Sequence, residues 1–138
     1  MGRIVAIDYG AKRTGLATTD PLKIIATGLT TILTKDIFKY LLNYCKEEDV
    51  EAFVIGDSKN LDNTPSQIAA SIKEFSEKLQ NLFPNKKIHW VDERFTSKIA
   101  HQSMVFTGMK KSKRQNKALV DEISAILILQ SHLENKLL

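Results

Sequence analysis

The sequence is organised around Arg3-Ile-Val-Ala-Ile-Asp8-Tyr-Gly10-Ala-Lys-Arg-Thr-Gly15, close to its start. Residues 4–7 are apolar and three of the four are β-branched, which is typical of a strand buried on both faces. Gly10 and Gly15 allow the backbone to turn and to return as an antiparallel strand over 15–19. A carboxylate at the end of a buried strand is costly unless a cation meets it, so Asp8 is the first candidate site residue.

Length and composition indicate one soluble domain, 1–138, with a single core. Hydrophobic residues make up 43% and charged residues 26% of the chain. Cys45 is the single cysteine, which excludes an internal disulfide and a cysteine-rich zinc site. The sequence has neither an apolar stretch of membrane-spanning length nor the apolar segment of a signal peptide, so we expect a cytoplasmic protein without membrane contact.

Hydrophobic periodicity predicts three strands followed by alternating helices and strands. Strands that each follow a helix imply parallel crossovers, whereas strands joined by short turns are antiparallel. The expected fold is therefore α/β, with a mixed five-stranded sheet of three antiparallel and two parallel strands and with helices on both faces. The predicted elements are strands at 4–8, 15–19 and 24–33, a helix after Thr34, a strand at 52–55, a helix from Thr64-Pro65-Ser66-Gln67 to Leu82, a strand at 88–91, a helix from 96 or 97 to 106 and a helix from about 113 to 137.

Several local details also follow from residue type. Thr34 is a good N-cap for the helix that comes after it. Gly28 inside the third strand indicates a β-bulge. Cys45 lies on the apolar face of a predicted helix, and we expect both Cys45 and Trp90 in the core, with a stacking role on nucleic acid left open for Trp90.

Acidic residues lie at three places where burial disfavours charge. Asp8 ends the first strand, Asp92 and Glu93 end the fifth, and Asp121 lies near the start of the last helix. Ligands gather at the carboxyl ends of parallel strands in open α/β sheets, so we expect these acids to meet at one edge. Carboxylates in such proximity need a cation, and oxygen ligands suit Mg²⁺ or Mn²⁺. Two such ions about 3.5–4 Å apart can support phosphodiester hydrolysis.

A basic segment lies close to the last of these acids. Residues 107–117 contain five cations and no anion, in a chain whose formal net charge is +4. Such a segment would attract the phosphate backbone of a nucleic acid. Plainer interpretations stay open: a lone acid at a strand end is usually a turn or cap residue, Asp92 could pair with Arg94, and a basic run is usually a solvated loop.

At these residues the chain resembles the YqgF/RuvX family, which is described as Holliday-junction-resolvase-like and as pre-16S rRNA nucleases. The resemblance covers nearly the whole chain. It is carried by Ile7 to Ala17, by Val91-Asp-Glu-Arg-Phe-Thr-Ser97, and by Lys117 to Asp121 followed by Ser124-Ala125 and Ile128-Leu-Gln130. One stretch departs from the family pattern, because the residues after the fourth strand, 56–63, lack its proline and its Asp-Gly turn.

The resemblance implies a ribonuclease-H-like fold and a metal-dependent nuclease that uses Mg²⁺ or Mn²⁺. By resemblance, Asp8, Glu93 and Asp121 are the catalytic and metal-binding carboxylates. The expected activity is that of a hydrolase acting on ester bonds, an endonuclease that processes the 5′ end of precursor 16S rRNA in ribosome biogenesis. The expected substrate-binding residues are Lys12, Arg13, Arg94, Lys110, Lys111, Lys113 and Arg114.

Other classes of function stay open at this point. A Holliday-junction resolvase that cuts branched DNA would use the same acids. A protein that only binds nucleic acid would keep the fold and not the reaction. Asp8-Tyr-Gly10 followed by Gly15 is also similar to the first phosphate loop of sugar kinases and actin-like ATPases, although those proteins need two lobes. The expected partners are precursor rRNA or branched DNA, with ribosomal particles, and the protein is expected to be a monomer or a homodimer.

Overall fold

The structure is a computed structural model that describes residues 2–57, 68–92 and 117–136. Within these ranges the strands and helices follow one another in the order that the sequence predicts. In chain order they are β1 (Arg3–Asp8), β2 (Arg13–Thr19), β3 (Ala26–Leu33), the short 3₁₀ helix η1 (Thr34–Asp36), α1 (Ile37–Glu47), β4 (Val50–Asp57), α2 (Ala69–Leu82), β5 (Lys87–Asp92) and α5 (Lys117–Lys136).

The five strands form one mixed sheet in the order β3-β2-β1-β4-β5. β2 is antiparallel to β1 and to β3, whereas β4 is parallel to β1 and to β5. The predicted topology of three antiparallel and two parallel strands is therefore confirmed. β1 is central, so the apolar run that ends on Asp8 lies in the middle of the sheet.

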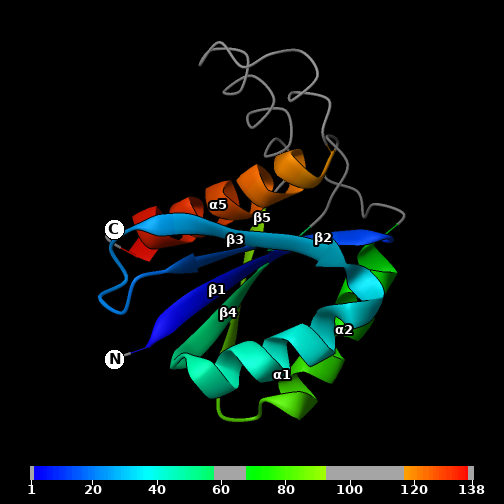
Figure 1. Cartoon of the computed structure of the whole chain (residues 1–138), viewed down its shortest axis with the longest axis horizontal. Helices are drawn as coiled ribbons and strands as arrows, with labels where there is room; N and C mark the ends of the chain where they lie inside the picture. The colour runs from blue at the N-terminus through cyan, green and yellow to red at the C-terminus, as the bar shows by residue number, and fades with distance from the viewer. Residues whose placement is uncertain (1, 58–67, 93–116, 137–138) are drawn as a thin grey trace.

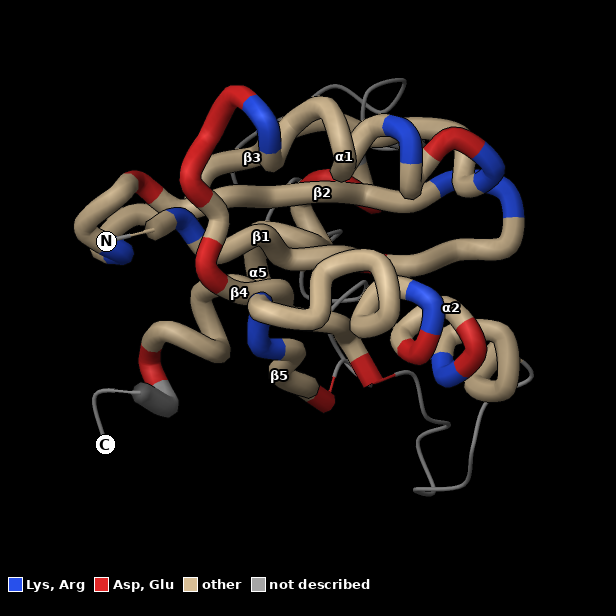
Figure 2. The backbone as a smooth tube through the Cα atoms, turned by 90° about the horizontal axis from the view of Figure 1, so that it is seen from below, with Lys and Arg blue, Asp and Glu red and all other residues tan. Residues whose placement is uncertain are grey.

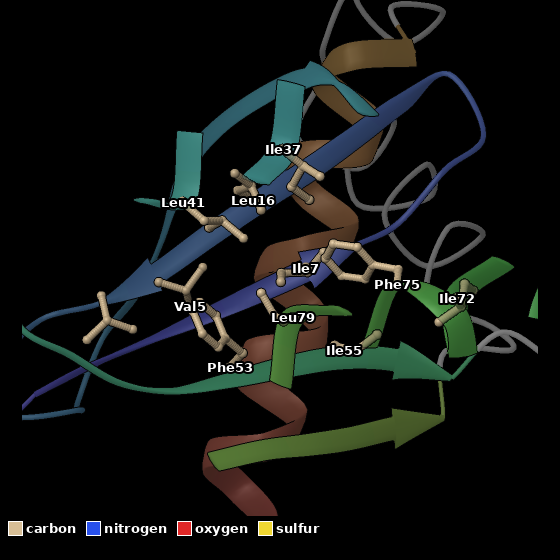
Figure 3. Packing of buried hydrophobic residues seen from close by; sticks show 11 residues of the cluster. Val5, Ile7, Leu16, Ile37, Leu41, Phe53, Ile55, Ile72, Phe75 and Leu79 are labelled. Atoms are coloured by element: carbon tan, nitrogen blue, oxygen red, sulfur yellow. The ribbon is translucent and has the colours of Figure 1, made fainter. Parts of the chain in front are cut away.

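Helices cover both faces of the sheet, with α1 and α2 on one face and α5 on the other (Figure 1). Side chains along β1 alternate between the two cores: Val5 and Ile7 face α1 and α2, whereas Ile4 and Ala6 face α5. We call these the α1/α2 face and the α5 face. The core on the α1/α2 face, shown in Figure 3, contains Val5, Ile7, Leu16, Ile37, Leu41, Val50, Phe53, Ile55, Ile72, Phe75 and Leu79.

The core on the α5 face is smaller and belongs to one helix. Ala125, Ile128 and Leu129 of α5 pack on small and β-branched side chains of the central strands. Their spacing of three and four residues places them on one side of the helix, and the same spacing puts Asp121 on that side too. None of the helices in the described part of the chain is long and apolar enough to cross a membrane.

Two local predictions are wrong. Thr34 does not cap α1: it opens η1, and neither η1 nor α1 has a side-chain cap hydrogen bond. Trp90 is 46% exposed and not in the core, because β5 is an edge strand with neighbours on one side only. Cys45 is half-buried against the core of the α1/α2 face, and burial raises the pKa of its thiol.

The bulge predicted at Gly28 is confirmed. The register between β2 and β3 shifts where Leu16 pairs with Thr30 and the next residue, Ala17, pairs with Gly28. One extra β3 residue lies between the two pairs, as in a β-bulge. The expected capping box at 64–67 and the expected helix at 96–106 lie outside the described residues.

Candidate active site

Asp8 lies at the carboxyl end of the central strand, on the α5 face. It follows Ile7, which belongs to the core of the opposite face, and side chains alternate along a strand. The side chain is half-buried, and its residue pairs with Gly15 of β2. Asp8 therefore stands half-buried at the end of β1, on the face of the sheet that α5 covers.

Gly15 brings α5 down onto this point. A Cβ atom at Gly15 would lie 2.1 Å from the carbonyl oxygen of Asp121 and 2.4 Å from its carbonyl carbon. The helix backbone at Asp121 therefore rests on the one β2 residue that has no side chain, directly beside Asp8 in the register. The structure thus brings Asp8 and Asp121, which are far apart in the sequence, together on one face.

Arg13 also belongs to this group. It is the first residue of β2 and shares the α5 face with Gly15, two residues further along the strand. Its Nε lies 3.5 Å from Oδ2 of Asp121, and the two side chains are 37% and 29% exposed. The sequence predicts a phosphate contact for Arg13, whereas in the structure its guanidinium pairs with one of the candidate carboxylates.

The turn between β1 and β2 is fastened by Thr34. Its backbone N–H donates to the carbonyl oxygen of Lys12 at 2.9 Å, and its hydroxyl donates to the carbonyl oxygen of Gly10 at 2.6 Å. Since that proton is used, the buried hydroxyl of Thr14 donates to Thr34 Oγ1 at 2.8 Å. Sequence reasoning missed this role, because a threonine before a helix has the same local signature when it serves as a cap.

The other predicted site residues lie apart from this group or outside the described residues. Lys12 is exposed on the turn. Asp92 pairs with Asp57 in the register and follows Val91, which belongs to the α5-face core, so it points to the α1/α2 face, away from Asp8. Glu93, Arg94, Lys110, Lys111, Lys113 and Arg114 lie outside the described residues.

The donor set of the site suits a hard divalent cation. Asp8 and Asp121 offer carboxylate oxygens, which are the ligands of Mg²⁺ and Mn²⁺. Within the residues that the structure describes, no group of three acidic, histidine or cysteine side chains could hold a metal ion. The described part of the site thus supplies two carboxylates that fit such an ion, and Glu93 is the expected third.

Comparison with known proteins gives concordant matches over the whole length. A family model described as RuvX, Holliday junction resolvase, matches residues 2–135. A protein of Christiangramia forsetii named "Putative pre-16S rRNA nuclease" is 54% identical over 133 residues, which is 96% of this chain and 98% of that protein. Proteins with the same name from Bacteroides fragilis and Flavobacterium psychrophilum are each 52% identical, over 99% of this chain and 99% and 100% of theirs.

A solved structure confirms the fold. The T. thermophilus RuvC structure in complex with a Holliday junction substrate matches with a TM-score of 0.57 and 14% identity, over 99% of this chain and 96% of that one. Together with the sheet order, this match confirms the ribonuclease-H-like fold that the sequence predicts.

Proposed function

Because this chain belongs to the RuvX family, we propose that it is a metal-dependent nuclease that hydrolyses phosphodiester bonds. One observation carries the proposal: Asp8 and Asp121 stand on the same face of the sheet, with the backbone of α5 seated on Gly15 between them. Two carboxylates are costly in such a partly sheltered position, where an apolar pair would pack at a lower free-energy cost.

The roles of the side chains follow from their chemistry. Asp8 and Asp121 would hold Mg²⁺ or Mn²⁺, and Glu93 would hold the metal or orient the attacking water. The bound metal would supply a nucleophilic hydroxide and stabilise the leaving oxygen. Lys12, on the exposed turn next to Asp8, would hold the substrate backbone, together with Arg94 and the cations at 110, 111, 113 and 114.

The proposed substrate is precursor 16S rRNA, which the protein would cleave as an endonuclease near the 5′ end. The names of the relatives from three genera support this substrate, at 52–54% identity over nearly the full length of each chain. Such a substrate would place the protein in the cytoplasm, with ribosomal particles. A four-way DNA junction is the second candidate, favoured by the family description and by the junction bound in the RuvC structure.

The test is cleavage of end-labelled precursor rRNA and of a four-way DNA junction, side by side, in Mg²⁺, in Mn²⁺ and in chelator. We expect cut RNA only when metal is present. Asp8→Asn should bind the RNA and fold as the unmodified protein does, with cleavage reduced at least about 10³-fold, because a charged carboxylate becomes a neutral amide with one ligand oxygen fewer.

The control is Asp92→Asn, which makes the same chemical change at the end of a neighbouring strand on the opposite face. It should keep most of the cleavage rate. Cleavage of the junction alone would replace the RNA substrate by the second candidate. Cleavage that survives Asp8→Asn would refute the assignment of the site.

A further inference from the structure

The ion pair between Arg13 and Asp121 has an unusual geometry. Nε of Arg13 is buried and lies 3.5 Å from Oδ2 of Asp121, close enough for an ion pair. Nevertheless Nε has no hydrogen-bond partner in the described part of the protein. At Nε the contact is therefore electrostatic, and this nitrogen takes no part in a bidentate hydrogen-bonded pair of the kind that arginine and a carboxylate frequently form.

Both partners are held by the backbone and not only by each other. Arg13 pairs with Leu33 in the sheet register, so its Cα is fixed by β3. Asp121 is fixed because its carbonyl group rests on Gly15, two residues beyond Arg13 on the same face. The guanidinium is thus directed at Asp121 by the fold, and a modest side-chain rotation would open the pair without moving either backbone.

The need for a positive charge at this place is clear. Asp8 and Asp121 share one partly buried face, where two like charges in proximity repel each other. The positive charge of a resident guanidinium offsets that repulsion.

We propose that Arg13 is a positioning residue that serves as the counter-ion of Asp121 in the metal-free protein and is displaced when a divalent cation binds. This inference rests on the proposed function, because it assumes that Asp121 is a metal ligand. Arg13 holds the Asp121 carboxylate in place, and it competes with the cation for the same oxygen. While it pairs with Asp121 the guanidinium is not available to a phosphate, so the phosphate contact predicted for Arg13 requires the pair to open.

The experiment compares Arg13→Gln with Lys39→Gln and Arg13→Lys in two measurements. Lys39→Gln removes the same charge from an exposed residue of α1, on the opposite face of the sheet, and therefore controls for net charge. The first measurement is thermal unfolding in chelator, alone and combined with Asp121→Asn. The second is the Mn²⁺ dissociation constant, from the electron paramagnetic resonance signal of free Mn²⁺, which needs no turnover.

We expect opposite effects of Arg13→Gln on the two quantities. In chelator the thermal unfolding midpoint of Arg13→Gln should lie about 2–4 °C below that of the unmodified protein. This difference should vanish when both proteins also carry Asp121→Asn. The affinity of Arg13→Gln for Mn²⁺ should rise by about three- to tenfold, the size of effect that one partly exposed charge exerts. Arg13→Lys should restore both values most of the way, and Lys39→Gln should change neither.

Other outcomes would overturn the proposal. Equal effects of Arg13→Gln and Lys39→Gln would show that only net charge matters, and weaker Mn²⁺ binding by Arg13→Gln would show that Arg13 supports the metal and does not compete with it. Mn²⁺ binding that ignores Asp8→Asn and Asp121→Asn would refute the metal site of the proposed function. In that case the unfolding cycle in chelator would still decide whether Arg13 and Asp121 are coupled.

Discussion

At the scale of single residues, the hydroxyl of Thr34 joins two segments of the chain. It donates to the Gly10 carbonyl and accepts from the buried Thr14 hydroxyl, so it closes a chain of three polar groups beside the turn that follows Asp8. Such a chain is worth more than its separate bonds, because removing the middle group leaves both neighbours unsatisfied.

Replacing either threonine by valine, which has nearly the same shape, tests this chain of hydrogen bonds. Thr34→Val should lower the free energy of unfolding by about 1–3 kcal/mol, since it orphans the Thr14 hydroxyl and the Gly10 carbonyl. Thr14→Val removes only a donor and should cost less than about 1 kcal/mol. Urea denaturation of both variants measures the difference, and equal losses would contradict this order of donors and acceptors.

Asp20 fixes the tip of the β2–β3 hairpin in a way that depends on pH. Its carboxylate accepts backbone N–H groups from Ile25, Ile24 and Leu22, and these bonds, that from Ile25 first, hold its pKa below the ordinary value of 3.8. A depressed carboxyl pKa stabilises the tip above the ordinary pKa, and the stabilisation is lost as the pH falls through the lowered value.

The backbone amide resonances of these three donor residues should report that loss. In an NMR titration the signals of Leu22, Ile24 and Ile25 should move together, with a midpoint below pH 3.8. Asp20→Asn keeps an acceptor oxygen but cannot titrate, so the same amides should stay still in that variant. A midpoint at or above 3.8 would show that the carboxylate does not hold the tip.

At the scale of secondary structure, the position of α5 depends on Gly15. A methyl group there would meet the Asp121 backbone at 2.1 Å, so α5 would have to move. Gly28 of β3 provides a matched comparison, because a methyl group there would meet Glu122 Oε1 at 2.2 Å, at the end of a flexible side chain that can rotate away.

Gly15→Ala should therefore cost about 1–3 kcal/mol of stability and about 10²-fold in cleavage rate, since a small displacement of Asp121 spoils the site. Gly28→Ala should change both far less. Denaturant unfolding and the cleavage assay on the two variants provide the measurement. A fully active Gly15→Ala protein would show that the seat of α5 on β2 does not position the reacting groups.

The elements differ in how far the sequence predicts them. β1 and its neighbours were predictable because burial on both faces leaves a local signature of β-branched residues. The bulge was predictable because Gly28 interrupts a strand. The meeting of Gly15 with Asp121, and of Arg13 with the same residue, was not predictable. It depends on the packing of segments far apart in the chain, and neither glycine nor arginine reveals its distant partner locally.

The same limit explains the errors. Thr34 has the residue type and the place of an N-cap, but tertiary contacts to Gly10 and Thr14 claim its hydroxyl. Trp90 follows an apolar pattern, but whether a strand lies at the edge of a sheet is a property of the whole sheet. The ends of the predicted elements and the family resemblance both predicted that Asp8 and Asp121 meet, with Glu93 as the third acid. For Asp8 and Asp121 the contact of α5 with Gly15 supplies the physical reason.

For the whole molecule, the distribution of charge matters more than the net value of +4. Acidic and basic residues are interspersed along α2, as Figure 2 shows, so this helix does not carry charge of one sign. The cations of the segment 107–117 have no acid among them. When lysine and arginine side chains neutralise phosphates, counterions are released from the nucleic acid. The salt dependence of binding therefore measures how many phosphates the protein neutralises.

Two variants with the same net charge separate the segment from the rest of the surface. The first replaces Lys110, Lys111, Lys113 and Arg114 by glutamine, and the second does the same to Lys39, Lys46, Lys73 and Lys78, which are exposed on α1 and α2. Binding of single-stranded RNA is measured in chelator over a range of salt concentrations. The first variant should reduce the slope of log affinity against log salt by up to about 3, at about 0.7 for each phosphate that is no longer neutralised, and the second should leave the slope unchanged. If both variants flatten the slope equally, the RNA senses the overall charge of the protein, and the segment 107–117 is not its binding surface.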